Sequence, residues 1–329
     1  MSRFKRPRKS LFKALLPIVL LLVCGLAGAV GWLVYSVVRP PRRPYLITPQ
    51  TFTSMSRRAQ RITEETWRNR DGMEARGWLL RGSEGAPAVI MLHSYGADRS
   101  RLLNLGVKLN ETTNFTILWP DLRGHGMNPL VAATSLGALE AEDVLAAVDY
   151  LRALKTPQGS LLAGTEMGFF GVELGGYAAL LAAAQQNPEA RARTLALDSV
   201  PTDADSLLRT VLPERAGVAH PGLQWLARIG TRVYFLGQYL NASSCSAAAQ
   251  LAGADVLLLS GKDAGPLRDS TIALSRCFPA STRVELNSEL PLTGIDLASA
   301  PGVQGEAYDR QVIEFFDRTL GATSTRQAP

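Results

Sequence analysis

Short apolar runs alternate with segments of helical periodicity from residue 74 to residue 320. A continuous apolar run such as AVIMLHS, residues 88–94, is typical of a strand that is covered on both faces. Strands that alternate with helices favour a mainly parallel sheet, because each parallel connection crosses over the sheet and a helix is the usual crossover. The expected strands are 74–82, 88–94, 115–122, 167–174, 193–200, 255–262 and 282–287, and the expected helices are 100–110, 139–154, 175–186, 245–252, 266–277 and 304–320. The sequence therefore predicts an α/β fold, with helices on both faces of the sheet, in one domain that spans residues 65–320.

The alternation breaks at residues 201–241. Apolar pairs such as Leu207-Leu208 form short helical patches there, and prolines and glycines separate the patches. We expect this segment to be a small insertion that covers the carboxyl edge of the sheet, and we call it the cap.

Residues 14–38 form an uncharged apolar run. A helix of this length crosses a hydrocarbon core of about 30 Å with some tilt. Six Lys or Arg precede the run and three follow it, at Arg39, Arg42 and Arg43, so the positive-inside tendency places the N-terminus in the cytoplasm. A cleaved signal peptide is the alternative, because Ala27-Gly28-Ala29 offers a small-x-small site, but the run is longer than a signal core needs.

The expected topology is therefore a single-pass signal anchor in the cell membrane. Residues 1–13 are the basic cytoplasmic tail, residues 14–38 are the transmembrane helix and membrane partner, and the main domain is extracytoplasmic. Residues 39–64 are a proline-rich stalk and lead-in that we expect to hold the domain off the bilayer. Residues 321–329 are expected to form a flexible tail.

The net charge of +6 comes from the N-terminal region. Residues 1–43 contain nine Lys or Arg and no acidic residue, which leaves 26 basic and 29 acidic residues in the rest of the chain. The expected globular part is slightly acidic, so no nucleic-acid partner is expected.

Cys245 and Cys277 are the two cysteines outside the apolar run. They lie on the expected helices before and after the strand 255–262, so we predict that they approach each other. One disulfide, which an oxidising compartment permits, and two isolated core thiols both remain open from the sequence.

Four motifs follow one another along the expected strands. They are HSYGADRS at 93–100, DLRGHG at 121–126, GVELG at 171–175 and SGKD at 260–263. In this order they resemble the α/β-hydrolase fold across residues 65–320. The resemblance implies an oxyanion loop after the first motif, a nucleophile elbow of the type G-x-S-x-G at the third, and the acidic triad member at Asp263.

The chain departs from that pattern at three positions. Glu173 stands at the apex of the elbow, where the resemblance implies a nucleophile such as serine, and Ser94 stands where glycine is usual. The resemblance also implies a histidine late in the chain, yet the last histidine is His220 and the late loop 286–294 has none. This suggests a catalytically degenerate member of the superfamily.

The three histidines that exist have other expected roles. His93 and His125 lie in loops after strands, and we interpret them as residues that hold these loops together. His220 lies in the cap and is interpreted as a packing or solvated residue. The candidate binding residues are His93, Ser94 and His220.

Glu173 admits two interpretations. A carboxylate nucleophile forms an ester, and the hydrolysis of that ester needs the missing base. Alternatively, the carboxylate is stabilised at a helix N-terminus. The N–H groups of Tyr95 and Leu174 should still point at the apex, so a glutamate can fold back over this oxyanion hole and block it.

The sequence thus predicts a pseudoenzyme that serves as a non-catalytic binding or scaffold module. The alternative is a divergent hydrolase of small esters or acyl substrates that uses Glu173, with Asp263 as the remaining triad position. No cofactor or metal is expected, and the ligand is an unknown small molecule or protein partner. A histidine introduced at Ser288 or Glu289 is the expected way to restore the base.

Overall fold

The computed structural model describes residues 8–42, 44–129, 133–236, 238–239, 242–294 and 303–321. Its centre is an eight-stranded sheet in the order β1-β2-β4-β3-β5-β6-β7-β8. The strands are β1 Ile62–Arg68, β2 Glu74–Leu80, β3 Ala86–Leu92, β4 Thr116–Pro120, β5 Ala163–Val172, β6 Thr194–Asp198, β7 Asp255–Gly261 and β8 Arg283–Leu290. Strand β2 is antiparallel to both of its neighbours, and the pairs from β4 to β8 are parallel. The mainly parallel sheet is confirmed.

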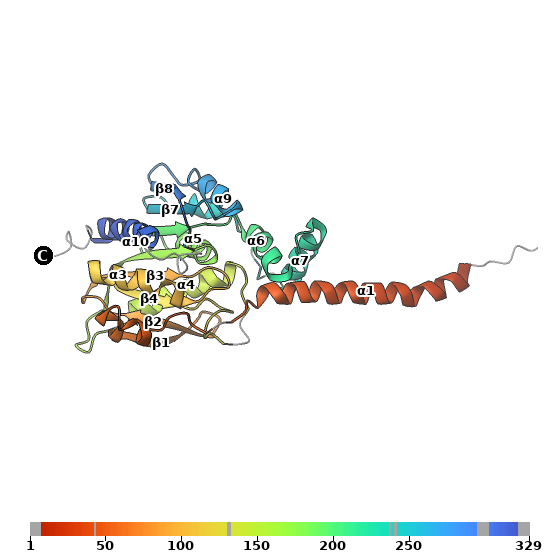
Figure 1. The fold of residues 1–329 in the computed structure, drawn as a ribbon, viewed down its shortest axis with the longest axis horizontal. Coiled ribbons are helices and arrows are strands. Elements are labelled where there is room, and N and C mark those ends of the chain that lie inside the picture. The colour runs from red at the N-terminus through yellow and green to blue at the C-terminus, as the bar shows by residue number, and fades with distance from the viewer. Residues whose placement is uncertain are drawn as a thin grey trace, which may run out of the picture.

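Helices cover both faces of the sheet (Figure 1). They are α1 Arg8–Val38, α2 Pro49–Phe52, α3 Leu103–Thr113, α4 Ala138–Ala153, α5 Leu174–Gln185, α6 Ala204–Ala216, α7 Pro221–Tyr234, α8 Ser244–Ala248, α9 Pro266–Leu274 and α10 Val303–Phe316. Alternate residues of β3 point to opposite faces: Ile90 joins the core under α4 and α5, and Met91 joins the core under α3 and α10. This two-sided burial explains why the strand is continuously apolar.

Strand β1 is an element that the apolar pattern does not predict. Its sequence ITEETWR is mostly polar, and Trp67 is its one buried residue. Trp67 stacks on Tyr150 of α4, with 5.0 Å between ring centroids. An edge strand with one face in water needs few apolar residues, so the sheet begins at Ile62, within the expected lead-in.

The segment after α1, which the sequence predicts to be a stalk, packs on the domain. The Tyr45 ring lies 5.1 Å from the Trp78 ring, and its hydroxyl donates a hydrogen bond to Asp121 Oδ2 at 2.6 Å. The Leu46 N–H donates to Ser100 Oγ at 3.1 Å. Prolines stiffen such a segment, but its aromatic side chains find buried sites and dock it.

Replacing Tyr45 by phenylalanine tests this docking. We expect Tyr45→Phe to lower the free energy of unfolding by about 1.5 kcal/mol, because it leaves the buried Asp121 carboxylate with one partner fewer. Urea unfolding of the detergent-solubilised full chain measures the change. Tyr35→Phe is the matched control, since the Tyr35 ring is exposed on α1. Equal losses in the two variants would contradict the docking role of the Tyr45 hydroxyl.

Helix α1 projects from the domain in Figure 1, and its residues Leu15–Val38 are long and apolar enough to cross a membrane. Its last turns differ from the rest, because Leu33, Val34, Val37 and Val38 are buried in the core of the domain. The last turns of the candidate membrane span therefore also belong to the core of the domain.

Cys245 and Cys277 form a disulfide with 5.1 Å between the Cα atoms. Cys245 lies in α8 and Cys277 follows α9, so the predicted approach across β7 is confirmed. Cys24 of α1 is free and exposed.

Candidate functional site

Glu173 lies at the apex of a sharp turn between β5 and α5. Its backbone has φ 51° and ψ −109°. Residues that carry a Cβ rarely adopt this backbone conformation, and it stores strain. Glycines on either side allow the turn: a Cβ on Gly175 would lie 2.3 Å from the Leu92 carbonyl oxygen, and one on Gly171 would lie 2.5 Å from Gly175. The sequence GVELG therefore folds as a nucleophile elbow with a glutamate at its apex.

The Glu173 carboxyl faces the backbone donors of the oxyanion loop. The Tyr95 N–H donates to Glu173 Oε2 at 2.9 Å, and the Leu174 N–H also stabilises the charged carboxyl. These are the two groups that the sequence names as the candidate oxyanion hole. The structure thus brings Glu173, Tyr95 and Leu174 together.

Burial is the largest influence on Glu173 and raises its pKa to about 7. The two N–H groups lower the pKa because they favour the charged form, and the nearby Glu214 raises it by repulsion. The carboxyl is therefore partly protonated near neutral pH.

Asp198 is a site residue that the sequence motifs do not identify. It ends β6, the strand beside β5, and its carbonyl oxygen accepts the Glu173 N–H at 2.8 Å. Its buried carboxyl accepts hydrogen bonds from Ser199 Oγ, the Gly294 N–H and the Tyr308 hydroxyl, and burial raises its pKa to about 6. The sequence does contain a signal for Asp198, since this residue ends an apolar strand. The carboxyl ends of adjacent parallel strands meet at one edge of the sheet, where sites form.

Asp263 follows β7 and contacts the late loop. Its Oδ2 accepts hydrogen bonds from the Thr293 N–H and the Thr293 hydroxyl, both at 3.2 Å. Next to Thr293, a Cβ on Gly294 would lie 2.8 Å from the Val172 side chain, one residue before Glu173. In the late loop, Thr293 thus contacts Asp263, and its neighbour Gly294 lies close to the end of β5.

Ser288 and Glu289 are the wrong positions for a restored base. Both lie within β8, and the Glu289 side chain is exposed and paired with Arg268 at 2.7 Å. The strand continues further than the sequence indicates, so the loop that reaches Asp263 begins only after Leu290.

His93 and His125 hold loops together through all four ring nitrogens. His93 contacts the Ser94 carbonyl through Nδ1 at 2.8 Å and accepts the Leu122 N–H at Nε2 at 3.0 Å. His125 contacts the Arg123 carbonyl at 2.9 Å and accepts the Gly96 N–H at 3.0 Å. Burial lowers the pKa of both imidazoles, to about 3 for His125.

The three candidate binding residues, His93, Ser94 and His220, have different surroundings. His93 and Ser94 are buried and engaged with backbone, so His93 offers no free ring nitrogen to a ligand. His220 is exposed at the N-cap of α7 and accepts the Gly222 N–H at 3.1 Å. In the part of the chain that the structure describes, no hydrogen bond connects His220 with Glu173.

The cap and α1 meet at the same loop. The Tyr95 hydroxyl donates to the Val37 carbonyl oxygen of α1 at 2.6 Å. Burial raises the pKa of this hydroxyl, and the charge of Arg215 at the end of α6 opposes the rise. Neither Val37 nor Arg215 carries a sequence signal for a site, because both arrive there through tertiary packing. The residue whose N–H donates to Glu173 is therefore held by α1 and lies near the charge of Arg215.

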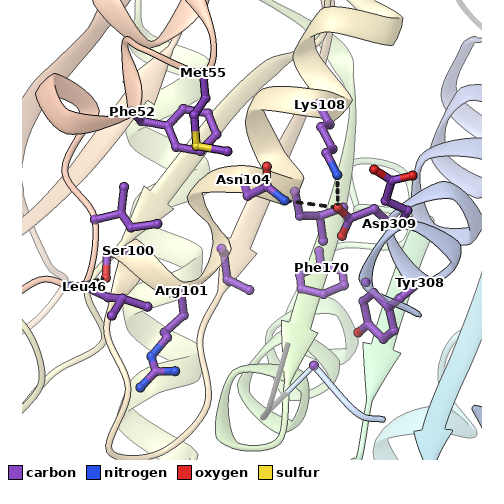
Figure 2. A pocket seen from close by; sticks show the side chains of 16 residues that line it. Leu46, Phe52, Met55, Ser100, Arg101, Asn104, Lys108, Phe170, Tyr308 and Asp309 are labelled. Atoms are coloured by element: carbon purple, nitrogen blue, oxygen red, sulfur yellow. Dashed lines mark hydrogen bonds and ion pairs between the residues drawn. The ribbon is translucent and has the colours of Figure 1, made fainter. Parts of the chain in front are cut away.

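A cavity of about 390 Å³ lies between α3 and α10 (Figure 2). Lys108 Nζ pairs with Asp309 Oδ2 in it at 2.7 Å, and Asn104 donates to the same oxygen at 3.3 Å. Glu173 does not line it, but Tyr308 and Gly294 do, and both contact Asp198. The cavity thus lies behind the site rather than over the elbow.

The order of the strands, the antiparallel β2 and the elbow after β5 define the class: the chain has the α/β-hydrolase fold, preceded by one N-terminal apolar helix. No known family profile matches the sequence, and no curated protein sequence matches it.

Solved structures of this fold resemble the chain. Esterase Pf2001 from Pyrococcus furiosus has a TM-score of 0.60 at 18% identity, over 85% of this chain and 99% of its own. The α/β hydrolase GrgF from Penicillium sp. sh18 has 0.58 at 17%, over 79% and 99%. The enol-lactonase from Burkholderia xenovorans has 0.51 at 18%, over 77% and 99%. Identities this low show a common fold alone.

Proposed function

We propose that this protein is a membrane-anchored module that uses the α/β-hydrolase fold to bind a small molecule or a protein partner without hydrolysing it. One observation supports this most strongly: the Glu173 carboxyl accepts the Tyr95 N–H, where an oxyanion hole would hold the substrate oxygen. A group that occupies these donors in the resting protein competes with any acyl substrate for them.

The surroundings of Asp263 support the same proposal. A triad needs an imidazole that bridges the acid and the nucleophile. The late-loop residue that hydrogen-bonds Asp263 is Thr293. A threonine hydroxyl is not a base near neutral pH. His93 and His125 are the two buried histidines, and backbone groups engage the ring nitrogens of both.

Residues 14–38 are proposed to anchor the protein in the cell membrane, with the N-terminus in the cytoplasm. The support is the exposed apolar surface of α1 over most of its length and the excess of basic residues before it. The Cys245–Cys277 disulfide is the form expected of a domain on the oxidising side of that membrane.

A divergent hydrolase is the second candidate, and the likeness to an esterase and an enol-lactonase favours it. In that case the ionised Glu173 carboxylate attacks the acyl carbon of an ester and forms a mixed anhydride. The alkoxide leaves and takes a proton from water, and a second water must then hydrolyse the anhydride. The pKa of about 7 leaves part of the carboxyl ionised at neutral pH, which such an attack requires.

The experiment compares the full chain with its Glu173→Gln variant, both in detergent. Turnover of short-chain nitrophenyl esters and labelling by a fluorophosphonate probe are measured. We expect no turnover above background from either protein. Multiple turnover by the unmodified chain that disappears in Glu173→Gln would overturn the binding proposal and establish the hydrolase.

A further inference from the structure

Helix α7 of the cap has a polar side and an apolar side. Arg228 and Arg232 are one helical turn apart, and both pair with Asp205 of α6, at 3.5 and 3.0 Å. Trp225, Ile229 and Val233 are also spaced by one turn, but they are exposed. Trp225 is 53% exposed and Val233 is 64% exposed, and Leu236 just after the helix is 87% exposed. The arginines thus face the domain while large apolar side chains face outward.

The helix packs directly on the expected membrane span. A Cβ on Gly230 would lie 2.7 Å from the side chains of both Val30 and Val34 of α1. A glycine at this point is what allows the two helices to approach so closely. In Figure 1, α7 stands beside the domain-proximal end of α1, on the side of the domain from which α1 leaves.

The contact between α7 and α1 determines how deep α7 lies relative to the expected bilayer. Val30 and Val34 flank Trp32, and Trp32 and Tyr35 are both exposed on α1. Exposed Trp and Tyr near one end of a membrane span belong at the boundary between headgroups and hydrocarbon. Because α7 contacts α1 at this level, its exposed apolar side chains lie at the same boundary.

The composition of α7 fits that boundary. Its sequence PGLQWLARIGTRVY contains two arginines and no acidic residue, and exposed Trp225 and Tyr234 provide aromatic anchors of the same kind as those on α1. A helix with a basic polar side and an apolar side that carries Trp is typical of helices that lie in the membrane interface.

We propose that α7 is an interfacial helix that inserts Trp225, Ile229 and Val233 into the lipid bilayer beside α1. The inference rests on the proposed anchor, which brings the bilayer to α7. It assigns the exposed apolar side of the cap to lipid rather than to a second copy of the chain, because this side continues the lipid-facing surface of α1. The cap is then held at the membrane surface by the inserted side chains of α7 and by the contact of α7 with α1.

The test uses the full chain with its disulfide intact, labelled at single cysteines with the environment-sensitive fluorophore NBD. Three proteins are compared: the natural chain labelled at Cys24, and Cys24→Ser chains carrying Val233→Cys or Arg283→Cys. All three are reconstituted in phosphatidylcholine and phosphatidylglycerol vesicles that contain lipids with a doxyl quencher either near the carbonyl or at mid-chain. Arg283 is the matched control, because its side chain is 85% exposed on β8.

We expect the label at residue 233 to lose roughly half of its emission to the shallow quencher, as a side chain in the interface should. The label at residue 24 should respond most to the deep quencher, and the label at residue 283 to neither. Quenching at 24 without quenching at 233 would overturn the interfacial helix and leave the anchor intact. No quenching at 24 would overturn the anchor. Cysteine crosslinking of two chains through residue 233, with no lipid quenching there, would assign the surface to a second copy.

Discussion

The double variant Glu173→Ser/Thr293→His is expected to hydrolyse a nitrophenyl acetate at least about 100-fold faster than Glu173→Ser alone, as a restored general base typically provides. Serine at the apex frees the Tyr95 and Leu174 N–H groups for an oxyanion. A histidine at residue 293 lies beside Asp263, since the present threonine bonds that carboxylate through both its N–H and its hydroxyl. Glu173→Ser alone should stay near background, because a serine without a base is a poor nucleophile.

Two controls make the result specific. Thr293→His with Glu173 retained should give no turnover, and Glu173→Ser/Ser288→His should give none because Ser288 lies within β8. Since residue 293 is buried, urea unfolding of each variant establishes that it is folded. High turnover from Glu173→Ser alone would mean that another group acts as the base, and would contradict the proposal of a silent site.

The parts of the fold that the sequence predicts are those where local pattern and tertiary burial agree. Strand β5 is an example: GFFGV is apolar throughout because both faces of the strand are covered. Gly171 marks the close approach of α5, and Gly168 marks that of Phe316 in α10. The elbow can be predicted because two glycines that flank three residues between a strand and a helix are the pattern of this turn. The resemblance to the α/β-hydrolase fold rests on such segments.

The missed elements are those in which one or two residues carry the packing. Trp67 is the one buried residue of β1, and the aromatic contact of the segment after α1 comes from Tyr45. Neither produces a periodicity, because a period needs several apolar residues. The shared role of Leu33 to Val38 is hidden for another reason: apolar residues look the same in lipid and in a protein core.

The residues of the candidate site also fall into two groups, those that sequence motifs identify and those that tertiary structure brings in. Glu173 and Asp263 lie in motifs and can be named from the sequence, whereas Asp198 and Thr293 reach the site through the pairing of β6 and the path of the late loop. The position for a histidine changed from residues 288 and 289 to residue 293 because β8 extends to Leu290. Strand ends are set by tertiary contacts, which local sequence does not record.

Glu173 should also make the stability of the folded protein depend on pH. Its pKa is raised by burial from an ordinary value of 4.5 to about 7, so between these values the folded protein holds a proton that the unfolded chain has released. The stability from this group is complete below pH 4.5 and is lost as the pH rises through 7. At pH 8, Glu173→Gln should therefore be more stable than the natural chain by about 3 kcal/mol, and near pH 4 the two should match.

Urea unfolding of both full chains in detergent, measured from pH 4 to pH 8, tests this difference. Asp198 and Asp143 also have raised pKa values, but both proteins retain them and their contributions cancel in the comparison. Glu214→Gln provides an internal check, because it removes the repulsion that raises the pKa of Glu173 and should shift the loss of stability to lower pH. Parallel stability curves for the natural chain and Glu173→Gln would show that the carboxyl at the apex has the same pKa in the folded and the unfolded chain. The backbone N–H groups would then balance its burial, and the self-blocking contact would be made by an ionised carboxylate at neutral pH.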